Sequence, residues 1–477
     1  MSTLSRHRPS FAFPLERLTR KLTLALVGMA ALTGAVSARG GEPDPSATLP
    51  DARIPGLEAV IDKAMTQSPQ MMAQNIELSR AAAGRTMAYS GLYPSLSGNV
   101  RYADMAVSTT GTENNSRVGL DYFLTLSQPL FHWGELRAQA KTGDLDEDIA
   151  HKRYAQAYRD LVGQIRTLYL RLIIQKKALS MRERTLRLLE KSLAYDKQQL
   201  AAGRITANDY EAKRTDLDEA QVGYDRDALA FSQARESIAQ LAGLKAIAAD
   251  SIPSDLPRPD WSAAQAGALV TYFDQTGREA GLPSLEIARD QVRESELRYK
   301  IAKVRLLPKL DAVAQTSMQS QTYLVSNRAT QSATSEQMVG VAVNWPIFDG
   351  FATRGAKQQA LADKRSSMLQ LQTVEASLDS RKRDAVEQCD LSARSLAIAE
   401  RRLGFARGGL SYIEGEQKAN RASEAQVEQA RTAVLNAQLA AMSARADLYM
   451  RWSDLVGLLW MDPALNRIPV TYLSHAQ

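Results

Sequence analysis

The 477-residue sequence is poor in several residue types, and each shortage excludes a class of protein. Its one cysteine, Cys389, can form neither an intrachain disulfide nor a cysteine-based metal site. The four histidines are scattered, and no His-Glu-x-x-His, Walker A, Gly-x-Ser-x-Gly or Rossmann pattern occurs. We therefore expect no enzyme, no cofactor and no bound metal.

Aromatic residues are also scarce, at 6% of the chain, which leaves little aromatic core. The composition, 44% hydrophobic and 23% charged, excludes both a disordered chain and a polytopic helical membrane protein. Abundant Ala, Leu, Gln, Arg and Glu favour long helices. The predicted class is mostly α.

Residues 1–38 have the layout of a secretory signal peptide: a basic start, an apolar segment and small residues at Val36-Ser37-Ala38. A transmembrane anchor is the alternative, but about 15 apolar residues fall short of the roughly 20 that span a bilayer. This segment holds five of the 59 basic and one of the 53 acidic side chains, so 54 and 52 remain. The mature chain is thus nearly neutral, and we expect no nucleic-acid partner.

The remaining sequence contains two copies of one unit. Residues 92–96, with Pro94, recur as 306–310, with Pro308, and residues 127–131 recur as 344–348. Gly243 and Gly457 close the two copies. We predict these parts: signal peptide 1–38, first repeat 39–244, linker 245–282, second repeat 283–458 and C-terminal tail 459–477.

Each repeat reads as helix, strand, loop, strand, very long helix, tight turn and shorter helix. The first helices begin at Pro69 and Pro283. In the strand 118–126, apolar residues alternate with residues that are small or polar except for Phe123, so that one face is apolar. The first repeat has a polar, glycine-containing turn predicted over 108–116. The second repeat has strands over 310–318 and 339–345, with a Ser/Thr-rich loop predicted over 322–337.

The long helices carry a coiled-coil pattern. From 134 to 202 no proline occurs, which predicts a helix on the order of 100 Å long. Gly203 ends it, and Thr206 caps a returning helix that runs to 241. The second repeat has the same pair of helices, predicted over 350–414 and 423–456. Cys389 lies on the apolar seam of the first of these, which favours a buried core thiol over a nucleophile. The first seam recurs every seventh residue: Ile165, Leu172, Leu179, Leu186, Leu193 and Leu200.

Strands of about 10 residues with one apolar face fit a transmembrane β-barrel. Four strands cannot close a barrel, for which about eight are the minimum, so several copies must pool their strands. The alternative, a soluble four-stranded sheet, does not explain helices that lead directly out of the strand ends. The signal peptide, barrel strands and long rods together indicate an outer membrane pore with a conduit across the periplasm.

On these motifs the sequence resembles the TolC-like outer membrane efflux protein family. The resemblance rests on the duplicated prolines at 94 and 308, the strand-to-helix segments 127–131 and 345–350, and the turn at 202–206. It implies a homotrimer in which four strands per chain form a 12-stranded transmembrane β-barrel above a long α-helical coiled-coil barrel. It also implies contact with outer membrane lipid, a periplasmic adaptor protein and an inner membrane transporter, for efflux or type I secretion. The alternative is a periplasmic coiled-coil adaptor or scaffold, which would carry a β-rich domain beside a single hairpin.

The resemblance also implies where functional residues lie. Asp209 matches an acidic position at the periplasmic tip, whereas Gln426 and Gln429 stand where family members carry aspartates, which leaves ion selectivity open. For the tip residues, a solvated helix face is the alternative. The candidates for a constriction are Asn208, Asp209, Glu424, Gln426, Glu428 and Gln429. The candidates for adaptor contact are Gly203, Arg204, Thr206, Arg421 and Ser423, and those for a membrane-interface belt are Phe131, Trp133, Trp345 and Phe348.

Overall fold

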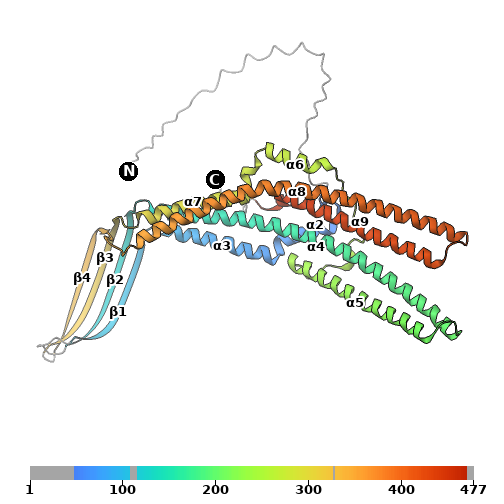
Figure 1. Cartoon of the computed structure of the whole chain (residues 1–477). Coiled ribbons are helices and arrows are strands. Elements are labelled where there is room, and N and C mark those ends of the chain that lie inside the picture. Colours follow the sequence, from blue (N-terminus) through green and yellow to red (C-terminus); the bar gives the residue numbers. More distant parts are fainter. Residues whose placement is uncertain (1–47, 108–114, 326–327, 470–477) are drawn as a thin grey trace, which may run out of the picture. The chain divides into compact units, whose positions relative to one another are not determined.

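The computed structural model describes residues 48–107, 115–325 and 328–469, so the predicted signal peptide lies outside them. These residues form long helices and one four-stranded sheet (Figure 1). Among the helices described, none combines the length and the apolar character needed to cross a bilayer.

Both halves of the chain contain a helix, two strands, a very long helix and a shorter helix in this order, and they differ in the short helices around this unit. The first half contains α1 (Pro50–Arg53), α2 (Pro55–Gln67), α3 (Pro69–Ser90), β1 (Ser95–Val107), β2 (Asn115–Phe131), α4 (Glu135–Ala201) and α5 (Ala207–Ala242). The second contains α6 (Ala263–Gln275), α7 (Pro283–Val304), β3 (Lys309–Val325), β4 (Arg328–Asn344), α8 (Ala352–Lys418), α9 (Glu424–Leu458) and the 3₁₀ helix η4 (Pro463–Arg467).

Two predictions from the sequence were wrong in extent. The segment 322–337, predicted as a loop, is largely strand, because β3 continues to Val325 and β4 begins at Arg328. Its Ser/Thr residues give no apolar alternation to detect, although threonine favours strands. The loop predicted over 108–116 lies mostly outside the described residues, and its last two positions belong to β2.

The sheet is antiparallel, in the order β1-β2-β3-β4. Tyr122 lies opposite Val100 on β1 and Met318 on β3, so these three side chains share one face. Asp121 shares the other face with its partners Arg101 and Gln319. Within the described residues, the outer edges of β1 and β4 have no pairing strand.

The helices form an array in which α4 contacts α3 and α5 on one side and α7 and α9 on the other, while α8 contacts α7 and α9 (Figure 1). The predicted seams hold this array together. In α4, Ile165 and Leu172 are completely buried and Leu186 is 8% exposed. In α8, Cys389 is completely buried and Leu396 nearly so.

The middle of the array carries additional short helices, among them α1, α2, α6 and η4, and most of the core. Tyr158, Leu161 and Ile165 of α4 pack against Leu57 of α2 in the largest apolar cluster. Phe273 of α6 packs with Trp452 and Cys389 in a second cluster. The last described segment, within the predicted C-terminal tail 459–477, is part of this core, since Leu465 and Ile468 are buried.

Gly243 ends α5 in the left-handed conformation, with φ +71°. A Cβ there would lie 1.8 Å from the carbonyl oxygen of Gln67. The C-terminus of α5 therefore abuts the last residue of α2, and only glycine allows this approach. Gly457, the matching residue in the second repeat, meets only the Arg159 side chain, at 3.8 Å.

Candidate functional site

The two faces of the sheet differ in chemistry, as a membrane-spanning strand requires. Along β2, Leu120, Tyr122, Leu124 and Leu126 are 37–48% exposed on the apolar face. Asp121, on the opposite face, is only 5% exposed. A wall with an apolar outer face and a polar inner face is typical of a water-filled transmembrane barrel.

A left-handed turn links each sheet hairpin to its long helix. Trp133 and Gly134 have φ of +55° and +78° before α4, and Gly350 and Phe351 have φ of +61° and +67° before α8. The indole N–H of Trp133 donates to the carbonyl of Pro308 over 2.8 Å, which compensates for this uncommon backbone conformation. The turns therefore set the same sharp exit in both repeats.

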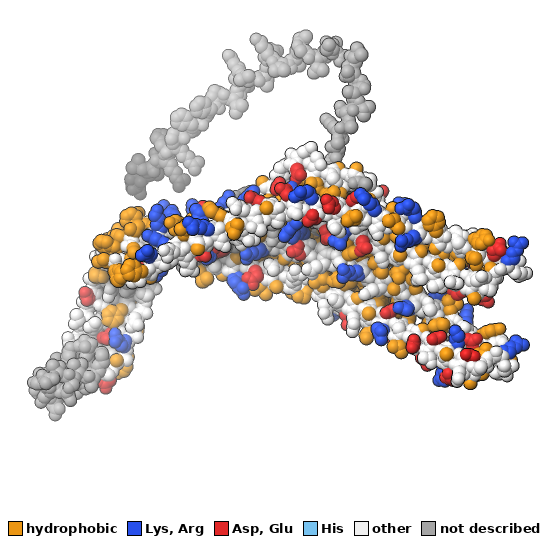
Figure 2. Space-filling model, viewed as in Figure 1, with side chains coloured by type: hydrophobic (Ala, Val, Ile, Leu, Met, Phe, Trp, Pro, Cys, Tyr) orange, Lys and Arg blue, Asp and Glu red, His pale blue; other side chains and the backbone are white. Residues whose placement is uncertain are grey.

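Large aromatic side chains surround these turns, and apolar side chains gather there on the surface (Figure 2). The rings of Phe131 and Trp133 meet edge to face with centroids 4.9 Å apart, and Phe348 contacts Phe351 in the same way. All four proposed belt residues, Trp345 included, are more than 40% exposed. Exposed aromatic rings at the end of the strands are placed as a membrane-interface belt would be, which stays a prediction.

The two hairpin tips are built alike. Gly203 and Asn420 adopt left-handed conformations at φ of +67° and +56°, as expected for residues that end helices. Thr206 begins α5 with a capping box: its hydroxyl accepts from the Asp209 amide, and Asp209 accepts from the Thr206 amide. Ser423 and Gln426 make the same box at α9.

Two of the predicted constriction residues, Asp209 and Gln426, use their side chains in the capping boxes. The hydroxyl of Thr206 donates to the Asp209 carboxylate over 2.7 Å and holds the pKa of that carboxyl below its usual range. The amide oxygen of Gln426 likewise accepts from its own helix end. Asn208, Glu424 and Gln429 are exposed. Among the adaptor candidates, Arg204 and Arg421 are exposed, and basic side chains lie at both tips (Figure 2).

Glu428 joins the two hairpins. Its Oε1 lies 3.6 Å from Nη2 of Arg184 on α4, and its Oε2 lies 3.4 Å from Nη1 of Arg431 on its own helix. Arg431 continues to Glu414 of α8 over 3.3 Å. This row of four alternating charges crosses α4, α9 and α8. Arg184 and Glu414 had no motif that could reveal them in the sequence, because their partners come from distant helices.

The middle of the array is fastened by Arg166, which is 1% exposed. Its guanidinium donates to Asp462, to Asp51 of α1 over 2.9 Å and to Ser453 of α9 over 2.9 Å. Burial lowers the pKa of this guanidinium, but the bonds to Asp462 and Asp51 outweigh that effect and raise it. Arg166 therefore stays charged and ties both ends of the described chain to α4.

Nothing in the described residues suggests catalytic chemistry. No group of three or more His, Cys, Asp or Glu side chains in the described ranges is arranged to hold a metal ion. Burial raises the pKa of the Cys389 thiol to about 12, far from the value of a reactive cysteine.

A four-stranded sheet whose two hairpins continue into long helical hairpins defines a channel-forming outer membrane protein. The outer membrane efflux protein family matches residues 60–244 and 279–459, and the chain belongs to this family. It is an outer membrane channel with its helical part in the periplasm, and the alternative of a periplasmic adaptor or scaffold is set aside. The members of this family are channels for transport.

Similar proteins agree with this assignment. The chain is 25% identical to the proteases secretion protein PrtF of Dickeya chrysanthemi over 339 residues, 67% of this chain and 70% of that protein. The fold matches the Vibrio cholerae outer membrane protein VceC with a TM-score of 0.61, at 16% identity, over 84% of this chain and 95% of that chain. It matches the Campylobacter jejuni CmeC outer membrane channel with a TM-score of 0.66, at 13% identity, over 91% and 93%.

Proposed function

We propose that three copies of the chain form one exit duct, which a periplasmic adaptor protein and an inner membrane transporter open. The unpaired edges of β1 and β4 support the trimer. An open sheet edge inside a membrane leaves backbone N–H and C=O groups without partners, which is too costly to persist. When β4 of each copy pairs with β1 of the next, three copies give 12 strands and no edge.

The helices support the same closure, because exposed large apolar side chains lie at both margins of the array. The helices between the margins, α4, α7 and α9, expose only Tyr195 among the large apolar side chains described. The α3/α5 stripe comprises Met72, Ile76, Met87, Val222 and Leu229. The α8 stripe comprises Leu391, Ile398, Phe405 and Tyr412.

The α8 stripe repeats every seventh residue, like the buried seam of the same helix. It begins two residues after Cys389, the first position of that seam, and two positions lie about 200° apart around a helix. The helix therefore has two coiled-coil seams on opposite sides, of which α9 covers one. A second helix must cover the other, and the α3/α5 stripe of the next copy is the complementary apolar surface. Such head-to-tail contacts close a ring.

A cysteine cross-link tests this contact. Val222 and Phe405 lie about four turns from their hairpin tips, so the variant Val222→Cys/Phe405→Cys, in a Cys389→Ala background, should be oxidised to covalent dimers and trimers. Each single-cysteine variant is the matched control and should stay monomeric in denaturing gels. If outer membrane preparations of the double variant show no covalent dimers or trimers after oxidation, the α8–α5 contact is excluded.

The partners are proposed from the family, and the tips are where they would bind. Arg204 and Arg421 give each copy two exposed cations at the periplasmic end. The likeness to a proteases secretion protein favours a secretion role, in which the cargo is a polypeptide. The variant Arg204→Glu/Arg421→Glu should lose cross-linking to the adaptor while its conductance in planar bilayers is unchanged. Loss of both would mean that these residues act on the channel itself.

A further inference from the structure

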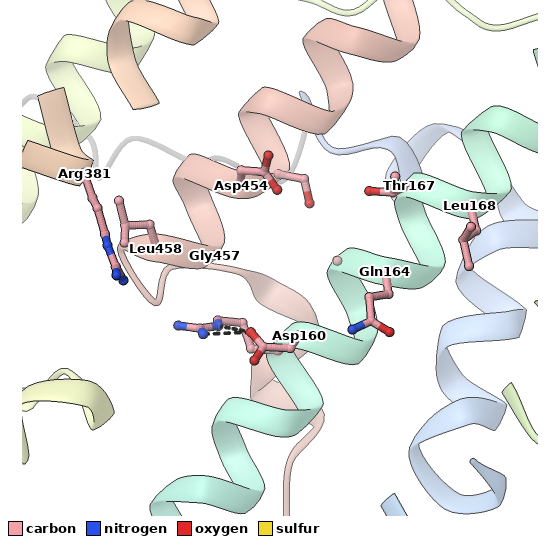
Figure 3. A pocket seen from close by; sticks show the side chains of 11 residues that line it. Asp160, Gln164, Thr167, Leu168, Arg381, Asp454, Gly457 and Leu458 are labelled. Atoms are coloured by element: carbon pink, nitrogen blue, oxygen red, sulfur yellow. Dashed lines mark hydrogen bonds and ion pairs between the residues drawn. The ribbon is translucent and has the colours of Figure 1, made fainter. Parts of the chain in front are cut away.

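A cavity of about 580 Å³ opens between α4, α8 and α9 at the level of the additional helices. Figure 3 shows Arg381 of α8, Asp454 of α9 and Gln164 and Thr167 of α4 around it. Its volume lies within the range of about 300 to 1,000 Å³ that is typical of small-molecule sites. Gly457 lines this cavity, and a Cβ there would meet only the Arg159 side chain, at 3.8 Å.

The cavity opens on the face of the array that carries no additional helices. Arg166 and Tyr169 of α4 are buried on the side where α1, α2 and η4 pack. Gln164 and Thr167 each lie two positions away from one of these residues, about 200° around the helix. In a closed ring of helices, only the outer side has room for a further layer. The cavity therefore faces the tunnel, and this statement rests on the ring proposed above.

Two of the four charged side chains in the cavity wall, Arg381 and Asp454, have no partner within it. Arg159 is bound to Asp160 through two hydrogen bonds of 2.9 and 2.7 Å (Figure 3). Arg381 has no hydrogen-bond or ion-pair partner among the described residues. Asp454 pairs with Arg451 over 3.9 Å, and Arg451 lies outside the cavity lining. The cavity wall therefore presents one guanidinium without a partner and one carboxylate whose partner is not part of the wall.

The polar groups beside these charges are also available. Gln164 and Thr167 make no side-chain hydrogen bond with the rest of the described chain. Leu168 and Leu458 add apolar surface to the lining. The ring contact proposed above uses α3, α5 and α8 stripe residues away from this junction, so a neighbouring copy does not fill it.

We propose that this cavity binds a small zwitterion on the tunnel wall, with the carboxylate of the ligand at Arg381 and its ammonium at Asp454. A short peptide with free ends has this chemistry and a suitable size. Arg381 offers a planar, charge-assisted contact to a carboxylate, and the leucines and amide group accommodate the peptide body. Each ring would present three such sites to solutes that pass through it.

Calorimetric titration of the purified trimer with tri-alanine tests the proposal. We expect saturable binding that weakens at least about tenfold in Arg381→Gln and in Asp454→Asn, as for loss of a charge-assisted hydrogen bond. Tri-alanine amide, which lacks the carboxylate, should bind wild type as weakly as tri-alanine binds Arg381→Gln. N-acetyl-tri-alanine, which lacks the ammonium group, should bind wild type as weakly as tri-alanine binds Asp454→Asn. The matched control is Arg383→Gln, an exposed arginine of α8 outside the lining, which should bind like wild type.

Absence of saturable binding to wild type, or equal affinity in all variants, would overturn the site. Both substituted side chains are exposed, so the variants should fold, and equal thermal midpoints check this. Light scattering and single-channel conductance on the same preparations report the ring and the channel. If trimers form and conduct but bind no peptide, the site is wrong and the proposed function stands.

Discussion

The guanidinium of Arg166 is bound by both carboxylate oxygens of Asp462, a residue 296 positions later in the chain. Both side chains are almost completely buried. A buried charge has lost its contact with water. Removal of one partner of the pair, which leaves the other charge buried and unpaired, is therefore much more destabilising than replacement of both partners. The pair therefore makes the position of the C-terminal segment a condition for a stable α4.

Replacement of Asp462 by Ala should destabilise the protein by about 3–5 kcal/mol, because the guanidinium of Arg166 stays buried with only part of its partners. Thermal unfolding of the purified protein measures this loss. Asp62→Ala is the control: Asp62 pairs with Arg467 at the surface, where such pairs contribute about 0–1 kcal/mol. Similar midpoints for both variants would show that the buried pair contributes no more than an exposed one.

The faces of β2 should respond differently to a charge. Leu124→Arg places a cation on the apolar face and should cost about 2–4 kcal/mol near the bilayer midplane. Thr125→Arg, one residue on, points to the polar face and should be tolerated. The yield of assembled protein in the outer membrane fraction compares the two. Equal loss from both variants would reject the assigned faces.

Leu186 tests the seam of the first hairpin. The side chain is 8% exposed, so Leu186→Ala leaves a cavity and should destabilise by about 2–5 kcal/mol. Lys191→Ala, at an exposed position of the same helix, should leave the thermal midpoint close to that of wild type. An unchanged midpoint in Leu186→Ala would count against tight packing there.

The ion pair between Arg184 and Glu428 should restrain the tunnel tip, because it joins helices of different hairpins. Such partly exposed pairs contribute about 0.2–1 kcal/mol each, and a ring would contain three. Glu428→Ala should therefore raise single-channel conductance in planar bilayers. Glu236→Ala, at an exposed position of α5 far from the tip and with no partner among the described residues, is the matched control and should conduct like wild type. Identical conductance in both variants would exclude the pair as a restraint.

Cys389 should be unreactive in the folded protein. Burial raises the pKa of its thiol from 9.0 to about 12, so the native state favours the protonated form. Its contribution to stability is complete below pH 9 and is lost as pH rises from about 9 to 12. At pH 8 a maleimide should label Cys389 only after denaturation, whereas Ser395→Cys, at an exposed position of α8, should add a site that reacts in the folded state. Rapid native labelling of wild type would disprove this burial.

Local signals predicted most of the fold. The prolines at 69 and 283, the capping residue Thr206 and the heptad that includes Leu186 predicted helices. Their predicted ends lie within a few residues of those of α3, α4 and α5, and α7 begins at Pro283 as predicted. These signals are properties of neighbouring residues in the chain, and a single sequence contains them. The strand length of β3 was missed because Ser and Thr on both faces hide the alternation on which a period-2 prediction depends.

The site was less accessible to sequence reasoning. The sequence marked Asp209 and Gln426 as polar tip residues, but their use in capping boxes depends on the conformation of the turn. Arg166 and Arg184 find their partners on other helices, so no local pattern announces them. The α8 stripe is also a heptad, but in the sequence it is offset by only two residues from the seam that contains Cys389. Only the burial of each side chain shows which of the two heptads is covered within the chain.

The two apolar stripes and the two open sheet edges have a consequence for biogenesis. A single copy that has reached its fold still exposes surfaces that attract other chains, and it loses this liability only when a ring closes. In the proposed trimer, closure needs three copies, so its rate depends steeply on how many copies are present at once. Slow synthesis prolongs the exposed stage, whereas rapid synthesis favours wrong contacts between stripes. The abundance of finished channels should therefore peak at an intermediate expression level.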